Sequence, residues 1–303
     1  MVFVTGKGGV GKTTVAAALA SAAAASGRRT ILCEVGAQAR GPRLWDRSEP
    51  DHGEEILLED GLSATSVDPT RALEQWLGTI VGGAPTKLLA RSNAFNYFVA
   101  AAPGARELVT MTKAWELVQE RRWQKKAEGY ETVIVDAPAS GHAVAMLRTP
   151  GTFADIARVG PIAKQAAAVR DFVTDPKQCA VVAVGLPSEL PVSETLQLED
   201  RLRDEAGRPV TAIVANAVLP QRRFTAAEVK TVEALEDDAD EGVRAAARAV
   251  RADHGRAREQ ARQLARLREG ARAPIVTLPF VFEGELGLED VRGLGERLAR
   301  ELG

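Results

Sequence analysis

A glycine-rich loop near the start of the chain sets the first limit on its architecture. The loop matches the pattern G-x-x-x-x-G-K-[ST] at every position, with the sequence Gly6-Lys7-Gly8-Gly9-Val10-Gly11-Lys12-Thr13. An apolar, β-prone run at residues 2–5 precedes it, and an alanine-rich helix former at residues 13–25 follows it. Glycines let backbone N–H groups turn toward a phosphate, and a helix N-terminus adds positive partial charge there. The segment therefore predicts a phosphate-binding loop between a strand and a helix.

Short apolar runs alternate with helical patterns along the rest of the chain. Besides residues 2–5, the strand candidates are residues 30–35, 62–67, 132–135, 180–186, 210–215 and 275–278. Buried strands that alternate with helices indicate a parallel sheet covered on both faces. We expect an α/β fold, a single three-layer P-loop domain over residues 1–303 with a mostly parallel sheet of seven or eight strands.

Four further segments carry organisational signals. Residues 66–128 and 151–178 are predicted to form a small helical subdomain, and their apolar side chains could line a small hydrophobic cleft. The polar stretch at residues 37–60 is predicted to be a long loop. A heptad-like apolar seam over residues 243–264 predicts a long helix that packs on residues 225–236. The same helix is rich in arginine, which is typical of a solvated face.

Composition excludes several classes of function. The chain has 39 basic and 41 acidic residues, a net charge of −2, so no general excess of positive charge attracts nucleic acid. It has two cysteines, Cys33 and Cys179, which are too few for a disulfide framework and lie in no zinc-binding pattern. No apolar stretch is long enough to cross a bilayer, and the phosphate loop begins too early for a targeting segment before it. We expect a cytoplasmic protein without nucleic acid partners.

The chemistry expected at the loop requires a lysine, a hydroxyl and a carboxylate. Lys12 would reach the β- and γ-phosphates of a nucleotide, and the Thr13 hydroxyl would ligate Mg²⁺. Asp136 ends the apolar run at residues 132–135, which has the form of a Walker B strand. A carboxylate in that position holds Mg²⁺ through water. These residues predict ATP and Mg²⁺ as ligands.

The loop also resembles a particular family. The stretch GKGGVGKTT, which extends the loop to Thr14, resembles the deviant Walker A loop of the ArsA-like ATPases, the arsenite-pump and tail-anchored-protein-targeting ATPases. Similar loops occur in partition and division-site ATPases and in the nitrogenase iron protein. In these families the first lysine of the loop crosses a dimer interface to the partner's nucleotide. The resemblance therefore implies that role for Lys7, in a homodimer or in a heterodimer with a related ATPase.

Later motifs follow the same family order. The stretch DAPASGH at residues 136–142 resembles the family's switch II, where Gly141 would offer a backbone N–H to the γ-phosphate. His142 has either a role in that switch or a structural one. The resemblance implies that Asn216, which ends an apolar strand, reads the adenine, with a strand-end cap as the alternative. It also implies that Pro279 and Phe280 belong to a loop that closes over the base.

One position departs from the family pattern. The family's second strand is followed by an aspartate that positions the attacking water, and an ungapped alignment places Gly36 there. Glycine cannot polarise water. Glu34 lies on the same side of the strand but roughly 6–7 Å away, so it could substitute only if the loop shifted. Nucleotide binding is therefore better supported than fast hydrolysis by an isolated chain.

Three functions remain open from the sequence. The first is a dimeric ATPase switch that couples ATP or ADP binding to capture or release of a client or membrane-protein partner. The second is the ATPase subunit of an export system for arsenite, antimonite or another anion, although such metalloids prefer several converging thiolates. The third is a partition-type scaffold ATPase, which would need a DNA-binding basic face. A short insertion at residues 151–178 argues against a groove for a full transmembrane helix.

Overall fold

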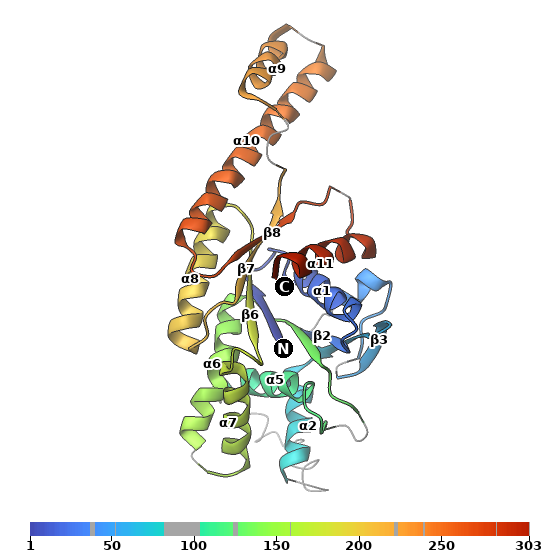
Figure 1. The fold of residues 1–303 in the computed structure, drawn as a ribbon, viewed down its shortest axis with the longest axis vertical. Coiled ribbons are helices and arrows are strands. Elements are labelled where there is room, and N and C mark those ends of the chain that lie inside the picture. The colour runs from blue at the N-terminus through green and yellow to red at the C-terminus, as the bar shows by residue number, and fades with distance from the viewer. Residues whose placement is uncertain are drawn as a thin grey trace.

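A central sheet of eight strands organises the computed structural model, which describes residues 1–36, 40–51, 53–81, 104–123, 127–157, 159–220, 224–238, 240–282 and 284–302 (Figure 1). The strands are β1 (Val2–Gly6), β2 (Thr30–Val35), β3 (Glu55–Glu59), β4 (Leu62–Val67), β5 (Thr132–Asp136), β6 (Ala180–Gly185), β7 (Ala212–Val218) and β8 (Ile275–Pro279). Their order in the sheet is β3-β4-β2-β5-β1-β6-β7-β8. All neighbouring pairs are parallel except β3 with β4. The predicted α/β fold and mostly parallel sheet are confirmed.

Helices cover both faces of this sheet. One face carries α1 (Lys12–Ala25) and α11 (Leu288–Leu302), which pack side by side (Figure 1). The helices associated with the other face are α2 (Pro69–Val81), α5 (Ala105–Glu116), α6 (Ser140–Ala157), α7 (Pro161–Thr174) and α8 (Glu189–Ala206). Successive strand residues therefore alternate between two apolar cores. Phe3 faces one core and Val4 the other, which explains why the strands are apolar throughout.

The alanine content of α1 serves close packing. Gly295 of α11 lies so near this helix that an added Cβ would stand 2.5 Å from the carbonyl oxygen of Ala18. Small side chains on α1 and a glycine on α11 let the two backbones approach each other. This contact fixes the helix that begins at the phosphate loop.

The prediction of one long loop at residues 37–60 is wrong. Gly41–Trp45 forms a short 3-10 helix, η1, and Glu55–Glu59 forms the antiparallel edge strand β3. The polar residues of this strand kept it from being predicted. They are tolerated there because the strand lies at an edge of the sheet, where Leu57 is 64% exposed. Pairing with β4, rather than an apolar pattern of its own, makes this segment a strand.

The expected helical subdomain stays a prediction. Helices α2, α5, α6 and α7 lie together at one end of the molecule and pack on one another (Figure 1). Of the apolar side chains expected to line a cleft there, Val169 and Val173 are buried, whereas Ile156 and Val159 are exposed. Residues 82–103, with Phe95 and Phe98, lie outside the described part of the chain.

Two helices project from the body between β7 and β8. The predicted long helix is α10 (Glu241–Gly270), which runs without a break through Gly255 and packs on α9 (Ala226–Asp238), as expected (Figure 1). Its last turns are anchored in the core by Leu264 and Leu267. The arginine-rich face is solvated, and some of its charges pair within the helix, as Arg262 does with Glu259.

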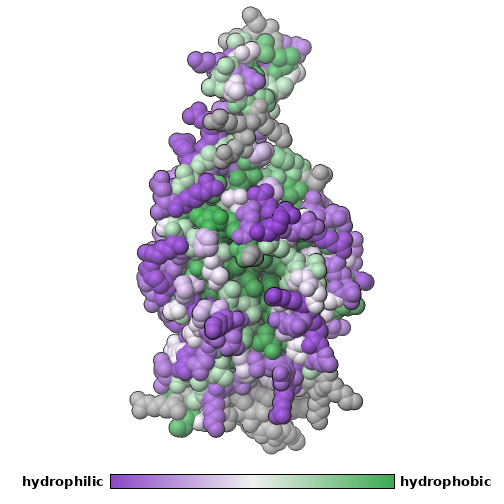
Figure 2. Space-filling view, in the orientation of Figure 1, coloured by the Kyte–Doolittle hydropathy of each residue, from purple (hydrophilic) through white to green (hydrophobic). Residues whose placement is uncertain are grey.

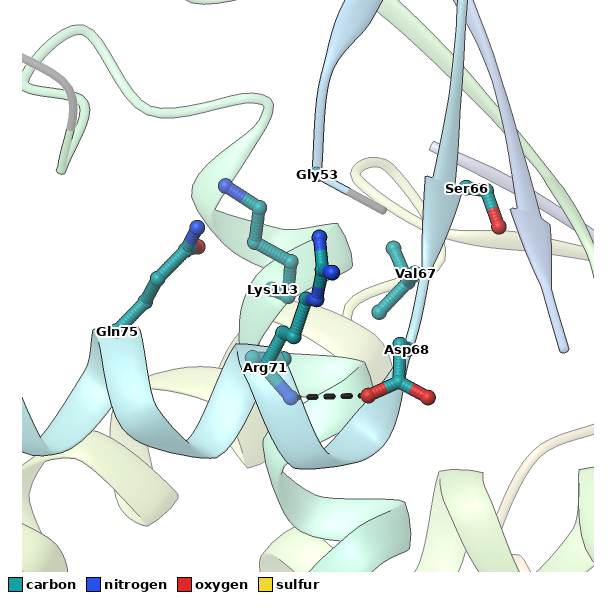
Figure 3. A pocket seen from close by; sticks show the side chains of 8 residues that line it. Gly53, Ser66, Val67, Asp68, Arg71, Gln75 and Lys113 are labelled. Atoms are coloured by element: carbon teal, nitrogen blue, oxygen red, sulfur yellow. Dashed lines mark hydrogen bonds between the residues drawn. The ribbon is translucent and has the colours of Figure 1, made fainter. Parts of the chain in front are cut away.

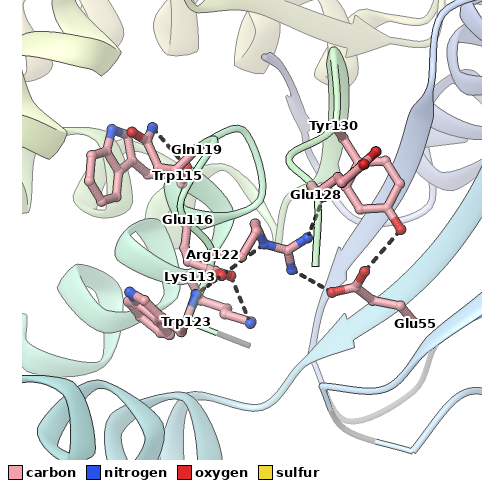
Figure 4. A network of polar contacts seen from close by, with 9 residues as sticks. All are labelled: Glu55, Lys113, Trp115, Glu116, Gln119, Arg122, Trp123, Glu128 and Tyr130. Atoms are coloured by element: carbon pink, nitrogen blue, oxygen red, sulfur yellow. Dashed lines mark hydrogen bonds and ion pairs between the residues drawn. The ribbon is translucent and has the colours of Figure 1, made fainter. Parts of the chain in front are cut away.

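A buried polar network joins the β3 edge to α5 (Figure 4). Arg122 lies at its centre, with Nε donating to Glu116 Oε1 at 2.8 Å and its terminal amino group bonded to Glu55. Glu116 also pairs with Lys113 Nζ at 2.9 Å, and Tyr130 Oη donates to Glu55 Oε2 at 2.9 Å. The side chains of Arg122 and Glu116 are fully buried. Two cations and two carboxylates thus neutralise one another in a largely buried cluster, in which Glu55 keeps partial contact with water.

Hydrophilic residues dominate the surface drawn in Figure 2, with apolar residues in smaller patches between them. Among the described residues, no helix is long and apolar enough to span a membrane.

Candidate nucleotide site

The phosphate loop lies at the carboxyl end of β1, between β5 and β6. The chain leaves β5 on one side of β1 and returns as β6 on the other, so the strand order reverses at this point. Ligands of open α/β sheets bind at such switch points. The position of the loop is therefore that of a ligand site.

Glycine is required at two positions of the loop. A Cβ on Gly6 would lie 2.2 Å from the carbonyl oxygen of Val184 on β6, because the loop leaves the sheet beside that strand. Gly11 caps the N-terminus of α1 with φ of 91°, and a Cβ there would lie 2.2 Å from Asn216 Nδ2. These contacts hold the loop against the strand ends and leave Gly8 and Gly9 exposed.

The expected metal ligands are in direct contact. Thr13 Oγ1, in the first turn of α1, donates to Asp136 Oδ2 at 2.6 Å. The other carboxylate oxygen, Oδ1, is buried and has no hydrogen-bond partner. Burial raises the pKa of Asp136, while the bond from Thr13 and the charge of Lys12 oppose that rise. A hydroxyl beside a buried carboxylate oxygen without a partner suits a hydrated Mg²⁺ ion.

The two lysines of the loop point to different partners. Lys12 Nζ donates to the carbonyl oxygen of Lys7 at 2.9 Å, so its ammonium lies across the loop. Burial lowers the pKa of Lys12, and the charge of Asp136 partly offsets this effect. Lys7 extends outward, half exposed, and pairs with Glu194 of α8 at 2.8 Å. Sequence reasoning did not single out Glu194.

The residues expected around the adenine lie on the next two strands. Asn216 Nδ2, near the end of β7, donates to the carbonyl oxygen of Val10 at 2.9 Å, which places its amide on the phosphate loop. The Phe280 N–H donates to the carbonyl oxygen of Val218 at 2.9 Å, so Phe280, directly after β8, lies beside the end of β7. Its ring meets that of Phe282 edge to face, with centroids 5.0 Å apart. Their role toward a base stays a prediction.

The switch II motif begins a helix. Gly141 lies in the first turn of α6, with open space where a Cβ would stand. The first N–H groups of a helix lack intrahelical acceptors. His142 is exposed, with Nδ1 3.5 Å from Glu107 Oε1 of α5. Residues 37–39 of the segment after β2 lie outside the described part of the chain.

Glu34 occupies a buried position beside Asp136, its register partner on β5. Its Oε1 accepts the N–H groups of Arg40 at 2.8 Å and Gly41 at 3.0 Å. Burial raises the pKa of Glu34 to about 7, although these two backbone bonds favour the ionised form. The carboxylate is thus engaged by the segment that follows β2.

This pKa makes stability depend on pH. The Glu34 pKa in the folded chain lies above its unfolded value of 4.5, so stability falls as pH rises from about 4.5 to about 7. The full effect is about 3 kcal/mol. Glu34→Gln removes this ionisation. The difference in free energy of unfolding, variant minus wild type, should therefore be about 3 kcal/mol larger at pH 8 than at pH 4.5. Urea unfolding at both pH values measures this; a constant difference between the two proteins contradicts it.

A small pocket lies apart from this site, between β4, α2 and α5 (Figure 3). Its lining includes Arg71, Gln75 and Lys113, and no residue of the phosphate loop. Asp68 Oδ1 accepts the Arg71 N–H at 2.9 Å and so caps the start of α2. Ser66 connects this region to the loop after β2, because its Oγ donates to the carbonyl oxygen of Gly36 at 3.3 Å.

Comparison with known proteins assigns the chain to a family. The family model for anion-transporting ATPases (ArsA) matches residues 1–159. ATPase BagA of Mycobacterium tuberculosis is 31% identical over 223 residues, which cover 72% of this chain and 65% of BagA. A relative from Halobacterium salinarum is 25% identical over 305 residues, 97% of this chain and 43% of its own length. The arsenical pump-driving ATPase of Escherichia coli is 25% identical over 234 residues, 72% of this chain and 39% of its own length.

The chain spans less than two thirds of these relatives' lengths. Its match to the family model nevertheless covers more than half of its residues, from β1 through the switch II motif. The chain belongs to the anion-transporting ATPase (ArsA) family.

Proposed function

We propose that the chain is a Mg²⁺-dependent ATPase that works as a dimeric switch. The observation that carries this proposal is the bond between Thr13 and Asp136 beside the phosphate loop, with Asp136 Oδ1 buried and without a partner. Membership of an ATPase family agrees with it. The switch would couple ATP or ADP binding to the capture or release of a protein partner.

Each group of residues at the site would have its own role in phosphoryl transfer. The N–H groups from Gly6 to Thr14 would surround the phosphates, and Lys12 would move from the Lys7 carbonyl to the β- and γ-phosphates. Thr13 and Asp136 would hold Mg²⁺, which neutralises phosphate charge when bound. Asn216 and Phe280 would contact the base. Catalysis by such a site is positioning and charge stabilisation without a covalent intermediate.

Hydrolysis by a single chain should be slow. Gly36 supplies no carboxylate, and Glu34 is buried against the backbone of Arg40 and Gly41. A partner subunit could provide the group that orients water. The test of the function is phosphate release from ATP by the purified chain, with Mg²⁺ and with EDTA. Release that depends on Mg²⁺ supports the proposal, and a chain that neither binds nor hydrolyses ATP overturns it.

Lys7 carries the dimeric part of the proposal. It would exchange Glu194 for the nucleotide of a partner subunit, because its ammonium is half exposed and on the outer side of the loop. We expect Lys7→Ala to bind ATP within about threefold of wild type but to lose ATP-dependent dimerisation. Light scattering with a non-hydrolysable ATP analogue measures this, and a variant that dimerises like wild type contradicts the crossing role.

The other two functions gain no support from this geometry. Burial raises the pKa of Cys33 to about 12 and also raises that of Cys179, so both stay thiols rather than the thiolates that arsenite prefers. Within the described ranges, no three His, Cys, Asp or Glu side chains gather to hold a metal ion. On the arginine-rich helix, Arg256 pairs with Asp253 and Arg262 with Glu259, which reduces the charge available to DNA.

A further inference from the structure

A bend near the end of β7 has a backbone conformation that its sequence does not favour. Ala217 has φ of 56°, in the left-handed region that residues with a Cβ seldom adopt. The pairing of β7 with β8 shifts register between Ala215 and Val218, on either side of this residue. Such a conformation persists only where surrounding contacts determine it.

Gln260 of the projecting helix α10 supplies those contacts. Its Nε2 donates to the carbonyl oxygen of Ala217 at 3.2 Å, and its Oε1 accepts the N–H of Leu219 at 2.8 Å. One amide side chain therefore binds the polar groups on both sides of Val218. An amide is the side chain suited to this task, because it offers a donor and an acceptor together.

Asn216 is the residue directly before the bend. The Asn216 amide donates to Val10 in the phosphate loop and fills the space that a Cβ on Gly11 would need. With Nδ2 engaged there, Oδ1 is left to accept a hydrogen bond from a base. The exocyclic amine of adenine can donate that hydrogen bond, whereas guanine presents a carbonyl oxygen at the same place.

We propose that Gln260 is a positioning residue for the nucleotide site: it holds the Ala217 bend and thereby aims Asn216 at the loop and the base. This inference rests on the proposed nucleotide function. It also gives α10 a mechanical connection to that site, because Gln260 lies one turn before Leu264, where the helix enters the core. Movement of the projecting helices would thus be transmitted to Asn216.

The test compares variants of Gln260 with a control on the same helix. Gln260→Ala removes both bonds, and Gln260→Glu keeps an acceptor for Leu219 but repels the Ala217 carbonyl. Gln263→Ala is the control, because Gln263 bonds to Glu259 on α10. We expect both Gln260 variants to weaken ATP binding about five- to tenfold, the equivalent of one net hydrogen bond. GTP binding and kcat at saturating ATP should stay within about twofold of wild type, and Gln263→Ala should match wild type.

A second change separates positioning from general damage. Glycine adopts φ of 56° without support, so Ala217→Gly in the Gln260→Ala background should recover most of the ATP affinity and the ATP-over-GTP preference. Hydrogen exchange at the Leu219 amide, measured without nucleotide, should rise in Gln260→Ala. Exchange that rises while ATP affinity and selectivity stay at wild-type values overturns the inference. A wild-type chain that binds no ATP instead overturns the proposed function, so the two failures are distinguishable.

Discussion

Lys12→Ala should lower kcat/KM for ATP hydrolysis about 10²- to 10³-fold, the range seen when one charge-stabilising donor is removed from a transition state. The ammonium already lies over the loop, 2.9 Å from the carbonyl oxygen of Lys7, and it is attached to the first residue of α1. No neighbouring described cation of the loop can replace it, because Lys7 extends outward to Glu194. Phosphate release and equilibrium ATP binding would measure the loss.

The fold should tolerate this change. Lys12 is partly exposed and adds no apolar side chain to either core. We expect the free energy of unfolding to stay within about 0.5 kcal/mol of wild type. Lys164→Ala removes the same charge from an exposed position on another helix, α7, and should leave turnover unchanged. Wild-type turnover by Lys12→Ala would show that ATP is hydrolysed elsewhere.

Arg122→Ala should destabilise the chain by about 3–5 kcal/mol, because it breaks a buried ion pair on one side only. Glu116 and Glu55 would lose the cation that they share, and the space left by the guanidinium lies between β3 and α5 (Figure 4). The stacking of the guanidinium on Tyr130, 5.7 Å from the ring centroid, would disappear as well. Urea unfolding at pH 7 measures the change.

Lowering the pH should reduce the difference in free energy of unfolding between Arg122→Ala and wild type. Burial alone raises the pKa of Glu116, but the bond from Arg122 and the charge of Lys113 outweigh it and leave the pKa below its usual value. A lowered folded pKa contributes stability above pH 4.5 that is lost as pH falls through the folded pKa. The variant lacks much of that contribution, so its deficit should be smaller at pH 4 than at pH 7. Arg203→Ala, on the surface of α8, should show no measurable change at either pH; equal stability of Arg122→Ala and wild type would contradict the argument.

The sequence predicted those parts of the fold that depend on local pattern. The phosphate loop, its flanking strand and helix, and the long helix α10 are all set by composition and spacing over short stretches. The match between residues 30–35 and β2 follows from an apolar run that is buried on both faces. The edge strand β3 could not be predicted in this way, because pairing with β4 forms it and one of its residues, Leu57, faces solvent.

The site was predictable in its chemistry but not in its contacts. A motif places Thr13 and Asp136 in one site, yet only the register of β5 beside β1 explains why they touch. Glu194 and Gln260 come from helices distant in sequence, and neither lies in a pattern that singles it out. The burial of Glu34 likewise depends on the segment that folds back over it, which no local pattern encodes.

The central place of β1 affects how the protein is made. Val2 pairs with Ile134 on one side and with Ala180 on the other, so β1 is synthesised long before either of its neighbours in the sheet. Until then the nascent chain carries an apolar strand whose backbone groups are unpaired, a surface that associates with other exposed strands. Pairing between such distant segments is also slow. The phosphate loop can therefore assume its final form only after β6 has left the ribosome, which gives chaperones a long interval in which to bind the unpaired strand β1.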